Sequence, residues 1–413
     1  YRNNMFLLKK YKNFLLFYIF LVGFLTIYYL IGVNAVLTYN AMSEWVINYQ
    51  GGFVRRGFLG EIVFQISLFL KLNLRFSFLI LQSFLYVYYY YLIYNLFKNI
   101  KLNYLILLAI FSPIFIFFPL AELEAIGRKE ILIFLLLIII LNLYFKYQKN
   151  NLILFTISIT YPFLLLVFEA SIFYSLFFIY LILITSEKLD LAYFINLLFL
   201  SLPTIIVILA IIYNPHLPEQ TDKMCDALKK IGENCGLASY FLSKTVNFHM
   251  LEVNWKFEHI IRYILIFIFG FGSLIILAFN SNYNVKKVNE IFLKIPFVYH
   301  LIVLILPTLI MFVIAVDTGR WTHMTYSCSI IFYFGLIKNK IIFLNYDSNF
   351  IKFIDSKLNN FFKILIFLIL CLSWNPKAVY KEDIGTIPIY RAIEKMPNFY
   401  NNIFNIKVFI EKQ

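Results

Sequence analysis

Long apolar runs separated by short polar stretches dominate this chain, and they predict a bundle of membrane-spanning helices. An apolar run of about 20 residues is long enough to cross the hydrocarbon core of a bilayer as a helix. The segments that fit lie near residues 13–33, 76–97, 103–119, 131–146, 152–167, 169–186, 193–213, 259–279, 296–316, 325–338 and 361–375. The pattern therefore predicts an all-α polytopic membrane protein with about eleven transmembrane helices, although 152–186 could also be one helix broken near Pro162 and Glu169.

A shorter apolar stretch, residues 58–72, follows the first long run and is too short to cross a bilayer comfortably. Glu61 and Gln65 are four residues apart in it, so they share one face of a helix. This favours an interfacial or re-entrant helix in the first outer loop. The alternative, a true span, would invert every later loop, and the distribution of lysines argues against it.

Lysines mark one side of the predicted bundle. They lie before the first span and in the loops that follow alternate spans, at Lys9, Lys10, Lys12, Lys98, Lys101, Lys146, Lys149, Lys188, Lys286, Lys287, Lys294, Lys338 and Lys340. By the positive-inside rule this side is cytoplasmic, and so is the N-terminus. The opposite, outer face receives the loops 34–75, 120–130, 214–258 and 317–324. The tail 376–413, after a transmembrane domain of residues 1–375, also lies outside, unless one more span reverses it.

The composition agrees with this class. Hydrophobic residues make up 62% of the 413 residues, and the mean hydropathy is +0.80, whereas soluble domains are about 45–50% apolar. The net charge of +14 would favour nucleic-acid binding in a soluble protein, but these lysines occupy short loops between spans. We therefore expect a lipid bilayer as a partner and no nucleic acid. The first span is too long for a signal peptide and is predicted to be retained.

The polar part of the first outer loop is unusual in so apolar a chain. It contains Glu44, Trp45, Gly51, Gly52, Arg55 and Arg56. The planar guanidinium of arginine binds phosphate through paired hydrogen bonds, and glycines let the backbone approach a ligand closely. The loop has no Walker pattern and faces away from cytosolic nucleotide. It therefore predicts an anionic, lipid-linked substrate rather than ATP.

Three further polar clusters fall on the predicted outer face. They are the charged stretch 122–130 with Arg128, the group Asp317, Arg320, Trp321 and His323, and the single carboxylate Glu169 between two apolar runs. Charges near hydrocarbon are costly unless they are paired, so each cluster is a candidate for function. The alternatives are a solvated turn at 122–130, an interfacial anchor at Trp321 and a Glu169 side chain that reaches the membrane surface.

The arginines are sorted to the outer face as well. Of the eight arginines in the chain, only Arg2 lies on the predicted inner side. The positive-inside rule predicts the reverse, so a function for the outer arginines explains the sorting better than chance combined with topology.

The cysteines fit the same orientation. Cys225 and Cys235 are ten residues apart in the longest outer loop, where an oxidising environment favours a disulfide over two free thiols. Cys328 and Cys371 lie in apolar spans and are expected to pack there. Histidine spacing does not indicate a metal site, so we predict no cofactor; a divalent metal is neither indicated nor excluded.

The outer residues suit the transfer of a group from a lipid phosphate. Phosphate binding and stabilisation of the leaving group are assigned to Arg55, Arg56, Arg128 and Arg320. The candidate bases, which would accept a proton from an attacking hydroxyl, are Glu44, Asp317 and Glu61. Contacts to the sugar are assigned to Trp45, Trp321, His323 and Glu169. The chain shows no Ser-His-Asp spacing and no nucleotide-binding motif.

This layout resembles the GT-C class of integral-membrane glycosyltransferases, whose first outer loop carries an essential acidic residue and a membrane-surface helix. Glu44 and residues 58–72 match those two features. The segments 49–57, 127–130 and 317–321 are similar to those of multi-span proteins from surface-polysaccharide clusters, assigned as O-antigen or capsule repeat-unit polymerases. The resemblance covers the layout of roughly residues 1–335. Many GT-C enzymes have aspartate where this chain has Glu44, which leaves the base open.

The resemblance implies a protein of the bacterial inner membrane that acts at the outer leaflet. It would transfer a sugar or oligosaccharide from a polyprenyl phosphate or diphosphate to an acceptor glycan, with envelope-assembly proteins as further partners. One alternative is a transporter or flippase of the same lipid-linked glycan. Transporters tend to have inverted repeats and charges at the membrane midplane, and neither is evident. The other alternative is a non-catalytic subunit of an envelope assembly complex.

Overall fold

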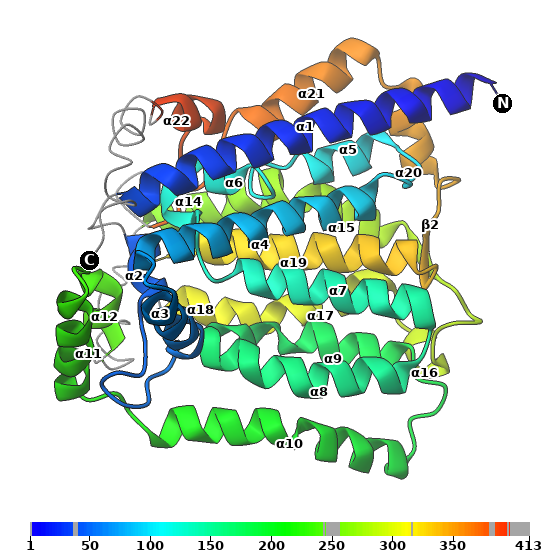
Figure 1. Cartoon of the computed structure of the whole chain (residues 1–413). Helices are drawn as coiled ribbons and strands as arrows, with labels where there is room; N and C mark the ends of the chain where they lie inside the picture. Colours follow the sequence, from blue (N-terminus) through cyan, green and yellow to red (C-terminus); the bar gives the residue numbers. More distant parts are fainter. Residues whose placement is uncertain are drawn as a thin grey trace.

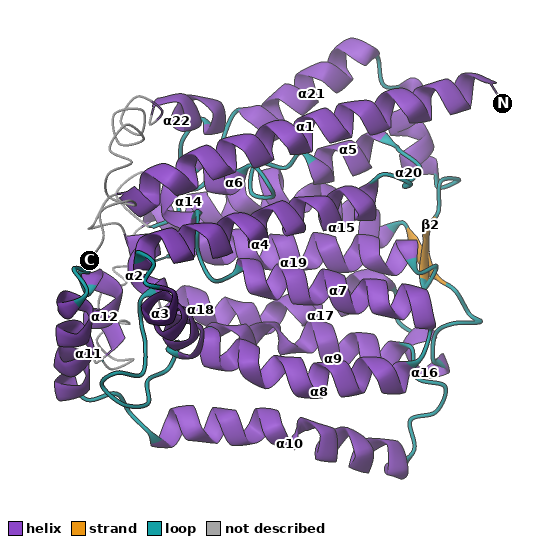
Figure 2. Ribbon diagram, viewed as in Figure 1, coloured by secondary structure: helices purple, strands orange, loops and turns teal. Residues whose placement is uncertain are grey.

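The structure, a computed structural model, describes residues 2–35, 40–242, 244, 257–314, 317–379, 385–394 and 396. Most of the described chain is helical, and the long helices lie side by side in one bundle (Figure 1, Figure 2). The α-helices are α1 (Arg2–Ala35), α2 (Asn40–Trp45), α3 (Phe58–Leu70), α4 (Leu74–Phe97), α5 (Tyr104–Ile110), α6 (Phe118–Ala121), α7 (Ile131–Tyr147), α8 (Asn150–Val167), α9 (Ser175–Ile184), α10 (Leu191–Tyr213), α11 (Pro218–Lys230), α12 (Gly236–Leu242), α14 (Phe257–Leu265), α15 (Gly272–Phe279), α16 (Glu290–Leu293), α17 (Phe297–Ile305), α18 (Leu309–Ile314), α19 (Thr318–Lys338), α20 (Asn349–Lys352), α21 (Asn360–Leu372) and α22 (Pro388–Glu394). Shorter 3-10 and π-helical pieces are η1 (Leu123–Ala125), η2 (Glu169–Tyr174), η3 (Ile266–Phe271), η4 (Leu306–Thr308) and η5 (Phe353–Lys357).

Six helical stretches in the described part of the chain are long and apolar enough to cross a membrane. They are Tyr11–Ala35, Leu74–Phe97, Asn150–Val167, Leu191–Tyr213, Phe257–Phe279 and Phe297–Ile314. Their outward faces expose large apolar side chains, as at Phe20, which is 70% exposed. These apolar side chains suit contact with hydrocarbon, and the helices satisfy their own backbone hydrogen bonds, as a membrane requires. The predicted class, an all-α multi-pass membrane protein, is confirmed to this extent.

The core lies where α1, α4, α7 and α19 pack together. α19 is buried along nearly its whole length, from Thr318 to Leu336, as expected for a helix surrounded by others. Some of its small polar residues bond to the helix backbone: the Thr322 hydroxyl donates to the Thr318 carbonyl at 2.8 Å, and the Ser329 hydroxyl donates to the Thr325 carbonyl at 2.7 Å. α19 therefore runs through the centre of the bundle and carries Arg320 in its first turn.

Two elements differ from the sequence-based prediction. α19 begins at Thr318, so residues 318–324 are helical rather than loop. Their polarity did not end the helix, because neighbouring helices bury these side chains. The predicted span 103–119 is two helices, α5 and α6, joined by turns around Pro113, which lacks the backbone N–H that a continuous helix needs.

The two ends of the bundle carry different basic residues, lysine at one end and arginine at the other. At one end, the lysine end, Lys338 Nζ donates to Asn142 Oδ1 at 3.0 Å and Lys287 Nζ donates to the Asn339 carbonyl at 3.0 Å. A small antiparallel pair, β1 (Ser281–Tyr283) and β2 (Ile342–Leu344), closes this end with Asn282 opposite Phe343. The N-terminus of α1 points the same way (Figure 1). The other end, the arginine end, carries α2, α3, α11, α12 and α22.

Helix α3 lies crosswise at the arginine end. Figure 1 shows it nearly along its axis, whereas the long helices of the bundle run across the picture. A Cβ atom at Gly60 would lie 1.9 Å from the Ile47 carbonyl oxygen, so only glycine allows α3 to approach the preceding loop this closely. Lys71 adopts a left-handed conformation after the last turn, a common helix ending. The chain then turns directly into α4.

Candidate functional site

Glu44 and Arg320 form the centre of an ionic cluster at the arginine end. Glu44, in α2, lies between two guanidinium groups: its Oε1 is 2.6 Å from Arg128 Nη1 and 3.2 Å from Arg320 Nη2. Glu44 and Arg320 are each 4% exposed, and Arg128 is 6% exposed. Ions are removed from water at a large cost, which is offset only where opposite charges meet with good geometry. The cluster is therefore held together as a unit.

Arg320 is the hub of this unit. Its Nε donates to Glu130, its Nη1 donates to Asp317 Oδ2 at 2.9 Å, and its Nη2 donates to Glu44. The side chain also lies over the Trp321 ring, with its Cζ 5.1 Å from the ring centroid. Each nitrogen of Arg320 thus contacts a carboxylate, and the positive end of the α19 dipole favours the same carboxylates.

The loop before α7 supplies three consecutive charged residues: Arg128, Lys129 and Glu130. Gly127 precedes them at φ +68°, a conformation that favours glycine, and its carbonyl accepts the Trp45 indole N–H. Lys129 is fully buried, and its Nζ donates to the Arg56 carbonyl at 2.7 Å. The loop therefore connects the centre of the cluster to the loop between α2 and α3.

The rim of the cluster consists of Arg55, Arg56, Glu169 and Asp317. Arg56 Nε is 2.8 and 2.7 Å from the two Glu169 carboxylate oxygens, and its Nη2 is 2.7 Å from Oε1. Arg55 Nη1 is farther away, 3.8 Å from Glu169 Oε1. The side chains of Arg55, Arg56 and Glu169 are 30%, 25% and 20% exposed, and that of Asp317 is 24% exposed. The rim is therefore the part of the cluster that reaches the protein surface.

Backbone strain marks the rim as well. Arg56 has φ +69°, a left-handed conformation that side chains other than glycine rarely adopt. The hydrogen bond from Lys129 to its carbonyl holds it there. This conformation aims the guanidinium at Glu169, whereas Lys129 lies on the other side, with its Nζ 6.0 Å from the Trp45 ring centroid.

The protein shifts the pKa values of Glu44 and Lys129, with different consequences for their charges. Burial alone would raise the pKa of Glu44, but Arg128 and Arg320 outweigh it and lower that pKa to about 2. Burial, only partly offset by Glu44, lowers the pKa of Lys129 to about 7. Glu44 is therefore a firmly ionised carboxylate, and Lys129 is a cation that can lose its proton near neutral pH.

Replacing Lys129 with methionine should remove a pH dependence of stability. In the folded protein the pKa of Lys129 is lowered to about 7, whereas in the unfolded chain it stays near its ordinary value of about 10.4. Between these values the unfolded chain binds more protons, so the free energy of unfolding rises with pH, by at most about 1.4 kcal/mol per pH unit. Melting curves of the solubilised protein at about pH 7 and about pH 9.5 should show this rise in the wild type and a smaller one in Lys129→Met; equal rises would contradict it.

The segment after α21 covers the start of α19. The Ala378 N–H donates to Glu122 Oε2 at 3.1 Å, and the Ala378 carbonyl accepts the Arg320 N–H at 3.3 Å. Arg262 donates to the Lys377 carbonyl. A Cβ atom at Gly319 would lie 1.9 Å from that same oxygen. The segment therefore covers one side of the cluster, where it bonds to Glu122, Arg262 and the backbone of Arg320.

The structure places the other predicted site residues outside the rim. Glu61 accepts hydrogen bonds from the Tyr49 N–H at 2.9 Å and from Gln50 Nε2 at 2.8 Å, so it organises the loop between α2 and α3. Trp45, Trp321 and His323 are 0%, 4% and 6% exposed. Their rings contact protein in this conformation, and their role as sugar contacts stays a prediction.

A second buried ion pair anchors the disulfide loop. Cys225 and Cys235 form a disulfide with Cα atoms 5.0 Å apart. Between them, Glu233 pairs with Arg75 at the start of α4, and Arg75 Nη1 also donates to the Asn34 carbonyl at 2.9 Å. Neither Arg75 nor Glu233 was a sequence-based candidate. They fasten α11 and α12 to the bundle and do not touch the rim.

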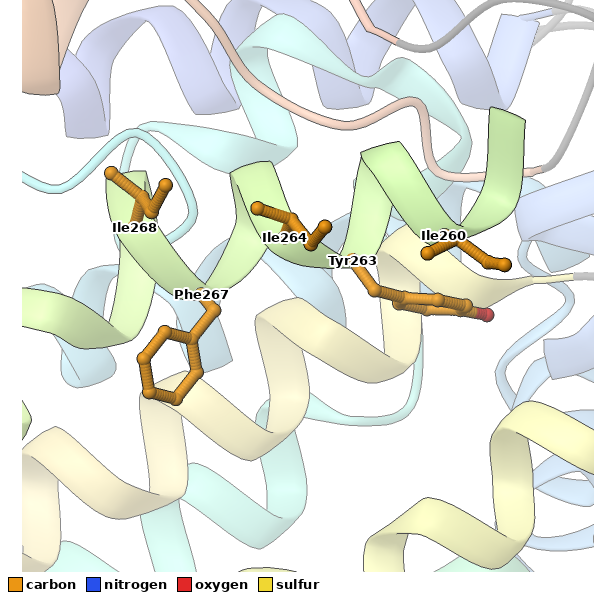
Figure 3. A pocket seen from close by; sticks show the side chains of 5 residues that line it. All are labelled: Ile260, Tyr263, Ile264, Phe267 and Ile268. Atoms are coloured by element: carbon orange, nitrogen blue, oxygen red, sulfur yellow. The ribbon is translucent and has the colours of Figure 1, made fainter. Parts of the chain in front are cut away.

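An apolar groove of about 360 Å³ runs along α14 and η3 (Figure 3). It is lined by Ile260, Tyr263, Ile264, Phe267 and Ile268. With no charged side chain in its lining, it suits a hydrocarbon chain and not an anion. Tyr263 packs against Phe312 in α18, with ring centroids 5.6 Å apart.

Sequence reasoning missed Lys129 and Glu130 as individual site residues. Both belong to the charged stretch 122–130, from which only Arg128 was selected, because arginine is the usual phosphate ligand. Their position in the sequence could have indicated them, because three charged residues directly before the apolar run of α7 must be buried or paired. The structure brings Glu44, Asp317 and the predicted arginines together, with Glu169 at their edge.

In the part of the chain that the structure describes, no group of three or more His, Cys, Asp or Glu side chains is placed to hold a metal ion. The cluster's own chemistry is the exchange of protons and the binding of anions by arginine and carboxylate. Comparison of the chain with protein-family models, with curated proteins and with solved structures finds no match, so the function follows from these residues alone.

Proposed function

We propose that the protein is a membrane glycosyltransferase that moves a sugar or oligosaccharide from a polyprenyl phosphate or diphosphate to an acceptor glycan. In this proposal it crosses the bacterial inner membrane about eleven times, with a cytoplasmic N-terminus, and works at the outer leaflet in O-antigen or capsule synthesis. The arginine end is then the outer end. α3, which runs crosswise there, is the interfacial helix.

The observation that carries the proposal is the partly exposed arginine pair at the edge of a buried ionic cluster. Such clusters are costly beside hydrocarbon and are generally functional. Among the cations of the described cluster, Arg55 and Arg56 have partly exposed side chains, and guanidinium groups bind phosphate in pairs. A ligand that carries both phosphate and hydrocarbon matches the rim and the neighbouring apolar surface. Lipid-linked sugars have this chemistry and need no cytosolic nucleotide.

The geometry divides the predicted arginines into two roles. Arg55 and Arg56 would bind the phosphate and stabilise the charge that develops on the leaving group. Arg128 and Arg320 are committed to Glu44, Glu130 and Asp317, so they would hold the site in shape. Of the carboxylates in the cluster, Asp317 and Glu169 have exposed surface and could meet an acceptor hydroxyl, whereas Glu44 is buried.

The apolar groove supports the lipid part of the proposal. A polyprenyl chain needs an apolar surface that continues toward the phosphate site. The groove on α14 and η3 offers an apolar surface (Figure 3). Arg262, in α14, donates to the Lys377 carbonyl in the segment that covers Arg320. The groove would thus guide the chain while the phosphate lies at the arginine end.

A transporter of the same lipid-linked glycan is the main alternative. Transporters place charges near the membrane midplane, whereas the cluster described here lies at one end of the bundle. A non-catalytic assembly subunit would use that end as a docking surface. Neither alternative has an observation of its own to favour it.

Lipid profiling of a deletion strain separates the three functions. Loss of a glycosyltransferase or polymerase should leave lipid-linked single units at the outer leaflet, where an externally added glycosidase can reach them, and should abolish long glycan. Loss of a flippase would leave the same lipids protected inside. Unchanged lipid-linked units together with lost complex assembly would favour the subunit, and an unchanged glycan would contradict the proposal.

A further inference from the structure

Glu169 lies where the proposal needs a phosphate. Its two oxygens accept hydrogen bonds from Arg56 Nε at 2.8 and 2.7 Å, and Arg56 Nη2 is 2.7 Å away. Arg55 Nη1 approaches from 3.8 Å. Phosphate oxygens would use these same donors. The protein's own carboxylate and an incoming phosphate therefore compete for the two arginines.

Of the ion pairs in the cluster, the one between Glu169 and Arg56 is best suited to exchange partners. Glu44 and Glu130 contact the hub Arg320 and are 4% exposed, so releasing either would leave a charge uncompensated inside the protein. Glu169 and its two arginines are 20–30% exposed at their side chains. Water can solvate Glu169 once a phosphate takes its place.

We propose that Glu169 is the catalytic base of the transfer, held inactive by Arg55 and Arg56 until the donor's phosphate displaces it. This inference rests on the proposed glycosyl transfer. A carboxylate bound to guanidinium groups resists protonation and is a weak base. Displacement removes that restraint only when the donor is in place, so binding of the donor and activation of the base become one event.

The step is balanced as follows. The acceptor hydroxyl oxygen forms a bond to the anomeric carbon of the donor sugar while the bond from that carbon to the phosphate oxygen breaks. The electron pair of the broken bond stays on the phosphate, where Arg55 and Arg56 stabilise it. The hydroxyl proton passes to the freed Glu169 carboxylate and is later released to water.

This arrangement predicts opposite effects on binding and transfer. Glu169→Gln removes the competing charge, so the variant should bind a prenyl diphosphate more tightly, by about tenfold within the usual range of coupling between sites. It also removes the base, so glycan formation should fall by about 10²–10⁴-fold. A residue that only supported the local structure would weaken both.

The test uses the full-length protein in lipid nanodiscs. Binding of farnesyl diphosphate and of inorganic pyrophosphate is measured for the wild type, for Glu169→Gln and for Asp226→Asn, which changes an exposed carboxylate on α11 that pairs with Lys229. Glycan formation is measured in the deletion strain carrying each gene. A preference for farnesyl diphosphate over pyrophosphate distinguishes a lipid ligand from a free phosphate. Asp226→Asn should match the wild type throughout.

Tighter binding with lost transfer in Glu169→Gln supports the inference. Unchanged or weaker binding, or normal glycan, overturns it. If the wild type itself binds no farnesyl diphosphate, the proposed function fails, which is a separate result. If Glu169→Gln does not fold, Glu169→Ala is used: added formate should restore part of its glycan formation by supplying the missing base, and absence of rescue overturns the inference.

Discussion

Replacing Arg320 with alanine should prevent the protein from accumulating in folded form. The substitution leaves three carboxylates, on Glu44, Glu130 and Asp317, without the guanidinium that now contacts each of them. Removing one partner of a buried ion pair costs about 3–5 kcal/mol, and a whole domain is stable by only about 5–15 kcal/mol. Size-exclusion profiles and melting curves of the solubilised variant measure the loss.

The matched control for this prediction is Lys229→Ala. Lys229 lies at the same end, but it pairs with Asp226 at 3.4 Å, and the two side chains are 68% and 66% exposed. Exposed pairs contribute about 0–1 kcal/mol, so this variant should melt close to the wild type. Arg320→Lys should be intermediate, because one ammonium cannot contact all three carboxylates. Wild-type melting of Arg320→Ala would show that the cluster does not hold the fold together.

Replacing Arg56 with alanine should abolish glycan formation while the protein stays folded. Arg56 is the rim cation with the closest contacts to Glu169, and in the proposal it stabilises the leaving phosphate. Loss of one such group typically lowers the rate by about 10²–10³-fold. Folding should survive because the side chain is 25% exposed and because alanine keeps the carbonyl that accepts the Lys129 hydrogen bond.

Glycan formation by this variant is measured in the deletion strain, beside the amount of protein in the membrane. Lys229→Ala is the control, since Lys229 is an exposed cation at the same end, 68% exposed at its side chain. It should form glycan normally. Wild-type glycan from Arg56→Ala at equal protein would remove Arg56 from the phosphate site.

Much of this architecture could be predicted because a bilayer imposes simple rules. Apolar runs had to become helices, as at α1 and α10, and the lysines of alternate loops do lie at one end of the bundle, as Lys338 and Lys287 illustrate. The start of α19 could not be predicted. Arg320 and His323 look like loop residues until carboxylates and rings from other helices surround them.

The sequence also could not predict which residues of the site pair with each other. Residue types predicted that Arg55, Arg56 and Glu44 would lie together, but charge alone does not specify which carboxylate meets which arginine. Glu169 is 113 positions from Arg56 in the chain and still binds it, because the junction of α8 and η2 faces the loop between α2 and α3. Lys129 was missed for the same reason: its burial depends on a loop far away in sequence.

The central claim is that the arginine rim binds a lipid-linked phosphate and that the protein transfers the attached sugar. The most direct measurement incubates purified protein in nanodiscs with the lipid-linked units extracted from the deletion strain. Wild-type protein should convert them to longer glycan and release the free polyprenyl phosphate or diphosphate, and Arg56→Ala should not. No conversion by the wild type, or equal conversion by both proteins, would contradict the claim.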